Sequence, residues 1–204
     1  MKIVEYGLLY WTVVGVLALL VASPFLSRVL VYPRTEFFTE LWILDADHRA
    51  ENYPFNLTHN QNYTIYLGVG NRLGYCAYYM VQVKFRNQTQ PAPTSFGPIE
   101  DRLPSSLPSL FNITAFVADE QVYEISITFS FNYAWDEQLS KVKFTSLRLN
   151  GVWLNMSSYT ISWDAETQEF RGFLFFELWL YNSSAGCFQY HGRFVGLRLN
   201  MTVF

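Results

Sequence analysis

The sequence predicts an all-β protein: an antiparallel immunoglobulin-like β-sandwich of about nine or ten strands that follows one N-terminal transmembrane helix. Three observations lead to this prediction. Residues 6–26 form an apolar run without charge, the residues after Phe37 alternate between apolar and polar side chains, and no helical period is sustained beyond the run. Alternation with period two is typical of strands that have one face in a core and the other in water.

The run Tyr6–Leu26 contains 21 residues. At about 1.5 Å of rise per residue, a helix of this length covers about 30 Å, the thickness of the hydrocarbon layer of a bilayer. Residues 1–5 would be a short N-terminal cap. A cleavable signal peptide is the alternative, since the small residues at 21–23 resemble a cleavage site, but Pro24 at the first mature position would hinder the cut. We expect a signal anchor and leave open a cut at the Ser23–Pro24 bond.

Residues 27–36 are predicted to be a spacer and residues 37–204 a single exterior domain. Within the domain, period-two segments are separated by turns rich in Asp, Asn and Gly. We predict strands at 63–69, 79–85, 123–131, 159–163, 170–181, 187–195 and 195–203. The segment 170–181 is apolar at both alternate positions, so we expect it in the centre of a sheet that is covered on both sides.

Five prolines interrupt the segment from Asn87 to Leu110. Loops of this length in compact domains are usually functional or mobile. We expect a solvated crossover between the two sheets, and a docking loop is the alternative.

Asparagine usage predicts the compartment. Seven of the twelve asparagines begin an Asn-X-Ser/Thr triplet, all after the apolar run, and such triplets mark N-glycosylation in exported chains. We therefore expect a single-pass cell-membrane glycoprotein with its C-terminal domain outside. The candidate glycosylation sites are Asn56, Asn62, Asn87, Asn112, Asn155, Asn182 and Asn200.

Charge and cysteine content limit the classes of partner that we expect. The net charge is −3 and the pI is about 5.6, and without a basic run this argues against a nucleic-acid partner. The expected partners are membrane lipid, N-linked glycans, other envelope proteins and copies of the chain. Cys76 and Cys187 fit an oxidising exterior, either as a disulfide or as two separate thiols. No pattern of metal ligands accompanies them, and we expect neither metal nor cofactor.

Few side chains qualify for catalysis. The sequence Asp-Ala-Asp-His at 45–48 offers metal ligands, although an Asp-rich turn is the commoner origin of such a sequence. Glu100 and Asp101 are adjacent in a flexible segment and do not define an acid–base pair. His59 and His191 stand alone in the sequence.

Glu177 lies alone inside the most apolar predicted strand. We expect it either to pair with Arg171 or Arg193 or to be exposed at a sheet edge. Without a nucleophile, metal or phosphate motif anywhere in the chain, we predict no enzyme activity.

Two segments carry a family resemblance. The sequence T-E-L-W-I-L at 39–44 is followed by A-E-N-Y-P at 50–54 and N-L-T at 56–58, and the chain closes on R-F-V-G-L-R-L-N-M-T-V at 193–203. Here the chain resembles an archaeal membrane-protein family known only as a domain of unknown function (number sixteen-sixteen). The motif residues are Thr39, Glu40, Trp42, Tyr53 and Pro54.

The resemblance covers residues 37–85 well and the last strand loosely. The spacing to Val69-Gly70-Asn71 is compressed, and Asn200 stands where the family often has Trp. It implies an archaeal cell-surface β-sandwich on transmembrane helices, without an assigned activity. The Tyr53–Pro54 pair would fix an extended start to a strand and bury an aromatic ring.

These features predict a non-enzymatic structural or interaction protein of the cell surface, for example an accessory subunit of an envelope or membrane complex. Two alternatives stay open. If the apolar run is removed, residues 26–32 become a free apolar extension, and the chain could be a secreted filament subunit assembled by strand donation. The second alternative is an exterior sugar-binding module or enzyme, which would need a convergent polar cluster.

Overall fold

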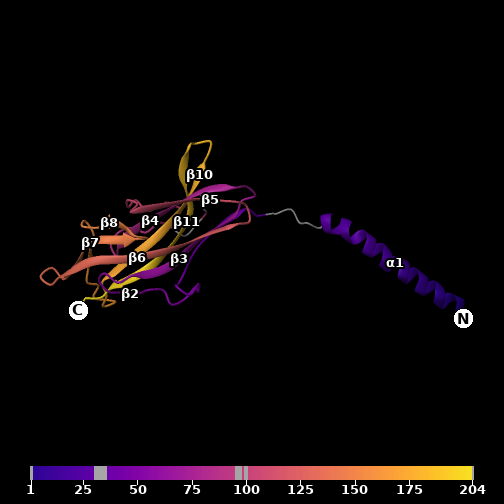
Figure 1. The fold of residues 1–204 in the computed structure, drawn as a ribbon, viewed down its shortest axis with the longest axis horizontal. Coiled ribbons are helices and arrows are strands. Elements are labelled where there is room, and N and C mark those ends of the chain that lie inside the picture. Colours follow the sequence, from indigo (N-terminus) through magenta and orange to yellow (C-terminus); the bar gives the residue numbers. More distant parts are fainter. Residues whose placement is uncertain (1, 30–35, 95–97, 99–100, 204) are drawn as a thin grey trace. The chain divides into compact units, whose positions relative to one another are not determined.

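The computed structural model describes residues 2–29, 36–94, 98 and 101–203 (Figure 1). It divides into two compact units, one with helix α1 (Lys2–Val29) and one that begins at Phe38. The predicted helix over 6–26 is confirmed, and it continues into the predicted spacer, whose residues 30–35 lie outside the described part. The proposed donor segment at 26–32 therefore begins within α1 and otherwise falls outside the described residues.

Among the described residues, no helix has both the length and the hydropathy that crossing a membrane requires.

The second unit contains eleven strands in its described residues, against the nine or ten that the sequence predicts. They are β1 (Phe38–Leu44), β2 (Asn56–Leu57), β3 (Tyr63–Arg72), β4 (Ala77–Asn87), β5 (Phe111–Val117), β6 (Val122–Asp136), β7 (Lys141–Leu149), β8 (Val152–Asn155), β9 (Thr160–Ser162), β10 (Arg171–Asn182) and β11 (Cys187–Met201).

The strands form two sheets. Sheet A has the order β1-β3-β6-β7-β8, with β9 also on β7, and sheet B has the order β2-β11-β10-β4-β5. All neighbours are antiparallel except β2 and β11, which are parallel. The predicted all-β sandwich is thus confirmed, and β10 lies inside sheet B as its two apolar faces indicate.

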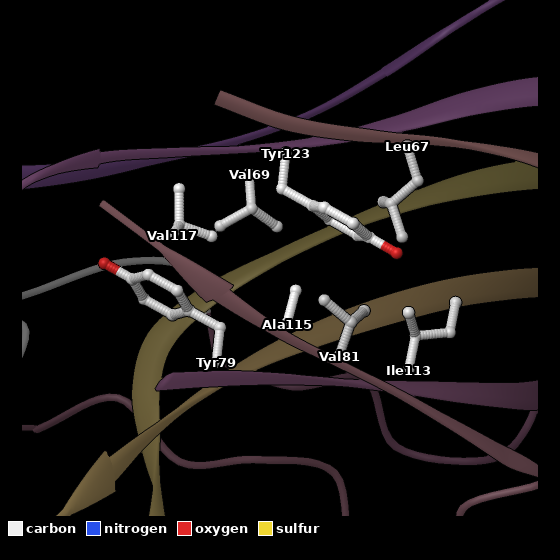
Figure 2. Close-up of a pocket in the computed structure, with 8 residues that line it drawn as sticks. All are labelled: Leu67, Val69, Tyr79, Val81, Ile113, Ala115, Val117 and Tyr123. Carbon is white, nitrogen blue, oxygen red and sulfur yellow. The ribbon is translucent and has the colours of Figure 1, made fainter. Parts of the chain in front are cut away.

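The core fills the space between the sheets. Phe85 of sheet B contacts Phe131 and Phe144 of sheet A, with ring centroids 5.4 and 5.2 Å apart. Figure 2 shows apolar side chains of the two sheets facing each other beside β5. The space that they leave is about 10 Å³, close to the minimum for one water molecule. This region is therefore packed core and not a ligand pocket.

Two predicted elements differ from the structure. The segments 187–195 and 195–203 are one strand, β11, because Gly192 with φ of 65° and a shift in register between Leu178 and Trp179 let the strand bend without ending. The segment 87–110 is not a crossover between sheets, because it connects β4 to β5, which are neighbours in sheet B.

Candidate functional site

Trp42 and Glu40, two of the residues on which the family resemblance was based, lie on the outer face of sheet A, over two glycines of the neighbouring strand. In the register of β1 and β3, Trp42 pairs with Gly68 and Glu40 with Gly70. A Cβ atom on Gly68 would overlap the Trp42 ring, and one on Gly70 would overlap the Glu40 carboxylate. Glu40 also lies 3.8 Å from Arg72. The motif therefore fixes β1 onto β3.

The remaining motif residues are structural as well. Thr39 is 1% exposed, and the Tyr53 hydroxyl donates a hydrogen bond of 2.8 Å to the carbonyl of Ile43. Burial, with a smaller effect of Asp45, raises the pKa of Tyr53, which keeps this donor protonated at neutral pH. Pro54 is partly buried beside it.

The Asp-Ala-Asp-His sequence forms a turn. Asp45 Oδ1 accepts hydrogen bonds from the backbone N–H groups of Asp47 (2.9 Å) and Arg49 (2.8 Å). His48 stacks on Tyr66 with ring centroids 3.7 Å apart, and its Nε2 lies 3.1 Å from Glu124 Oε1. Within the described ranges, no three residues of the His, Cys, Asp and Glu types lie close enough together to hold a metal ion.

The other isolated candidates are dispersed. His59 Nδ1 accepts a hydrogen bond of 3.2 Å from the Tyr133 N–H. Asp101 is exposed, and Glu100 lies outside the described residues. Cys76 and Cys187 are both exposed and unbonded to each other in the structure.

Glu177 on β10 forms a buried ion pair with Lys84 on β4. Lys84 Nζ lies 2.8 Å from Glu177 Oε2, and the side chains are 4% and 0% exposed. In the register of the strands Glu177 lies opposite Gln82, two residues from Lys84, and a lysine side chain spans this diagonal. The prediction of Arg171 or Arg193 as the partner is wrong, since sequence periodicity gives the face of a residue and not the strand beside it.

Ser105 of the proline-rich segment, residues 88–110, lies against this ion pair. Ser105 donates its N–H to Glu177 Oε1 at 2.7 Å and accepts a hydrogen bond of 2.8 Å from Lys84 Nζ on its carbonyl. Arg102 donates a hydrogen bond of 3.1 Å to the Gly192 carbonyl on β11. The described part of the segment therefore covers the outer face of sheet B, which explains why β10 is apolar on both faces.

Two aromatic residues flank the ion pair. The rings of Trp179 and Tyr190 meet edge to face, with centroids 5.7 Å apart. Burial, and then the charge of Glu177, raise the pKa of Tyr190 to about 12, so the phenol is protonated at neutral pH. In the described part of the chain neither Trp179 Nε1 nor the Tyr190 hydroxyl has a hydrogen-bond partner.

Four aromatic rings from four neighbouring strands lie together on the outer face of sheet B. We call Tyr78, Phe116, Tyr181 and Phe188 the aromatic strip. Tyr78 stacks on Phe116 with ring centroids 4.1 Å apart and an angle of 10°, and it meets Phe188 at 5.0 Å. Phe116 is 72% exposed and Tyr181 is 40% exposed. Tyr78, Phe116 and Tyr181 each follow or precede a core-facing residue on their strand, so sequence periodicity places these rings outside but does not show that the four rings meet.

A hollow of about 390 Å³ adjoins the strip at the β10–β11 hairpin. It is lined mainly by Tyr75, Tyr181, Asn182, Gln189 and His191. Burial, and then the charge of Arg193, lower the pKa of His191. The imidazole is therefore neutral at pH 7.

This end of sheet B is uncharged in sequence. The segments 74–82, 111–118 and 178–190, which supply the strip and most of the hollow, contain no Asp, Glu, Lys or Arg. Depletion of charge together with enrichment of aromatic residues is the composition of the buried centre of a protein–protein interface. This surface is the candidate functional site.

The seven sequons divide into two groups in the structure. Asn56, Asn62, Asn112 and Asn155 are exposed. The other three are partly buried, and their Nδ2 atoms donate hydrogen bonds within the chain: Asn87 to the Thr160 carbonyl (3.2 Å), Asn182 to Gln189 (3.0 Å) and Asn200 to Asn56 (2.9 Å). Asn56 and Asn200 are direct partners in the parallel β2–β11 pair.

We expect glycans on Asn62, Asn112 and Asn155, and none on Asn87, Asn182 and Asn200. A sugar on any of the last three would disturb a hydrogen bond that contributes about 0.5–1.5 kcal/mol. Asn56 and Asn200 lie about 5 Å apart across the strands, so at most one carries a glycan in a single molecule. Peptide mass spectrometry of protein from its own host measures the occupancy. A glycan on Asn87 with a bare Asn62 would contradict this assignment.

No protein-family model matches the chain, and no curated protein matches it. Solved structures similar to it include a chain of the complex between Zinc 2-glycoprotein and Prolactin inducible protein from human seminal plasma, with 8% identity and a TM-score of 0.37, over 83% of this chain and 98% of that one. Another is β-glucosidase from Listeria innocua in complex with glucose, with 8% identity and a TM-score of 0.36, over 85% of this chain and 17% of that one. Likenesses at this level carry no inference about function.

Proposed function

We propose that the chain is an exported, N-glycosylated structural protein of the cell surface, held at the membrane by its N-terminal helix. In this proposal its immunoglobulin-like β-sandwich joins a second copy of the chain through the aromatic strip. The observation that carries the proposal is the strip itself, in which Phe116 on the end strand β5 is 72% exposed and the segments that supply the rings contain no charged residue. Clustered exposed aromatic rings of this kind mark interaction sites.

A second copy is the partner that the surface favours. An uncharged patch meets its own copy without bringing like charges together, and a two-fold contact that uses one patch twice is the commonest form of homo-oligomer. No strand of the described residues pairs with the edge of β5 that faces away from β4, so this edge adds backbone hydrogen-bonding groups beside Phe116.

The proposal assigns no catalysis to the chain. This is supported by the candidate catalytic and metal-binding side chains, which already have partners within the fold. Glu177 pairs with Lys84, Asp45 caps a turn and His48 contacts Glu124.

The exterior and membrane parts of the proposal rest on the sequence, through the charge-free run at 6–26 and the seven sequons. Fractionation of host cells, N-terminal sequencing of the mature protein and glycan mass spectrometry test them together. Membrane-bound protein with residues 6–26 retained and sugar on the exposed sequons is the expected result. An unglycosylated chain in the cytoplasm would end the proposal, and a mature protein that begins near Pro24 would replace anchoring by secretion.

The contact between copies is tested on the full chain in detergent, with the protein mass measured by light scattering. We expect a dimer for the unmodified chain and a monomer for Phe116→Thr with Tyr181→Thr, because threonine keeps the strand propensity and removes the rings. Leu139→Thr is the matched control, since Leu139 is 56% exposed in a turn away from the strip, and it should remain dimeric. An unmodified chain that is monomeric would overturn the contact.

A further inference from the structure

Trp153 is exposed on the outer face of β8, the strand at the end of sheet A. Its side chain is 57% exposed, and it lies opposite Arg148 on β7, whose guanidinium carbon is 5.5 Å from the ring centroid. The alternate residue Leu154 faces the core. An exposed tryptophan beside an unpaired strand edge is a liability that folded proteins usually cover.

Asn155 follows Trp153 on the same face of β8. Residues two apart on a strand point to the same side and lie about 6–7 Å apart, and both are exposed. Asn155 Oδ1 accepts a hydrogen bond of 2.9 Å from the Ser157 N–H, which fixes the direction of the amide. No hydrogen bond between described residues uses Asn155 Nδ2, the atom that carries the sugar in an N-glycan. Ser157 completes the sequon.

We propose that Trp153 is a docking residue for the first sugar of a glycan on Asn155, and that the packed sugar covers the outer edge of sheet A. The inference rests on the glycosylation that the proposed function includes. A pyranose ring has one face of C–H groups that is largely apolar and slightly positive, and this matches the negative face of an indole ring. With Arg148 on one side of Trp153, the sugar takes the area that stays exposed.

A sugar at the outer edge of β8 would also prevent this edge from pairing with strands of other molecules. Among the strands of the described residues, β8 pairs with β7 alone, so one row of its backbone groups faces outward. Unpaired edges recruit strands from other molecules unless something bulky or charged blocks them. The docked sugar provides that block at β8, while the uncharged end of sheet B stays available for the contact between copies.

Asn62 provides the comparison site. It is an exposed sequon directly before β3, three strands from β8 in sheet A, and the residue two positions on is Thr64 and not an aromatic residue. A glycan on Asn62 should therefore add nothing that depends on a neighbouring ring.

The experiment is a cycle of variants of the full chain made in its glycosylating host. Ser157→Ala removes the sequon and leaves Asn155 in place, and Trp153→Thr removes the ring and keeps the strand propensity. We expect Ser157→Ala to lower the folding equilibrium constant about fivefold when Trp153 is present, and to have little effect in the Trp153→Thr background. Removal of the Asn62 sequon by Thr64→Ala should show no dependence on Trp153.

The experiment distinguishes a failure of glycosylation at Asn155 from a failure of the sugar to dock on Trp153. Peptide mass spectrometry that finds Asn155 bare would overturn the docking together with the glycosylation proposed at this site. An occupied Asn155 with equal effects of Ser157→Ala in both backgrounds would overturn the docking alone. Trp153 in the glycosylated chain should also react more slowly with an indole-oxidising reagent than in Ser157→Ala, and equal rates would likewise argue against the contact.

Discussion

Replacing Lys84 by methionine is expected to lower the free energy of unfolding by about 3–5 kcal/mol, because it leaves the Glu177 carboxylate buried without its counter-charge. The ion pair is 2.8 Å long and almost fully buried. Lys84 also holds the Ser105 carbonyl, so the same change should loosen the proline-rich segment. Urea unfolding of the purified chain, followed by circular dichroism, measures the loss.

Two further variants make this prediction specific. Lys143→Met breaks the pair between Lys143 and Asp136, which is 2.7 Å long but lies at the surface, and its effect should be far smaller. Glu177→Gln added to Lys84→Met removes the uncompensated charge and retains an acceptor for the Ser105 N–H, so it should recover more than half of the loss. A cost for Lys84→Met no larger than that of Lys143→Met would show that the buried pair does not matter for stability.

Replacing Phe85 by alanine is expected to cost about 3–5 kcal/mol through the cavity that it opens. Phe85 follows Lys84 on β4 but faces the core, where it is 1% exposed and contacts Phe131, Phe144 and Tyr159. Proteins of this size have little stability to spare, so the variant should be largely unfolded at elevated temperature. The midpoint of thermal unfolding is the measurement.

Gly172 supplies the control for the Phe85 site. A Cβ on Gly172 would lie 2.7 Å from Phe85 Cζ and 2.9 Å from Ile161 Cδ1, so Gly172→Ala alone overpacks the core by about 1–3 kcal/mol. Phe85→Leu makes room at the same place. The double variant should therefore lose less than the sum of the two single losses, and strict additivity would contradict the packing described at this position.

Periodicity predicted the strands with the clearest alternation and their faces, but it predicted none of β1, β5, β7 and β8 and divided β11 into two strands. The alternation at 63–69, 79–85 and 123–131 corresponds to β3, β4 and β6, and the two apolar faces of 170–181 correspond to the central position of β10. This succeeds because a half-buried strand must alternate and a strand inside a covered sheet need not.

Contacts that depend on register could not be predicted. Lys84 and Glu177 are 93 positions apart, and only the pairing of Glu177 with Gln82 shows that Lys84 is within reach. The aromatic strip could not be predicted for the same reason, since its rings come from four strands. The proline-rich segment was misassigned because prolines indicate where regular structure ends, whereas its place in the fold is fixed by hydrogen bonds such as that from the Ser105 N–H to Glu177.

The positions of the first and last strand residues of the β-sandwich, Phe38 and Met201, determine how the domain responds to a pulling force. Phe38 begins β1 beside Arg72, at one end of β3, and Met201 leaves β11 beside Leu57. There the Tyr63 hydroxyl, from the other end of β3, donates a hydrogen bond to the carbonyl of the adjoining Asn56. A force between Phe38 and Met201 thus acts along the strands, and the bonds between β1 and β3 must slide together instead of opening one after another. We therefore expect the sandwich to unfold slowly when force is applied between these two points.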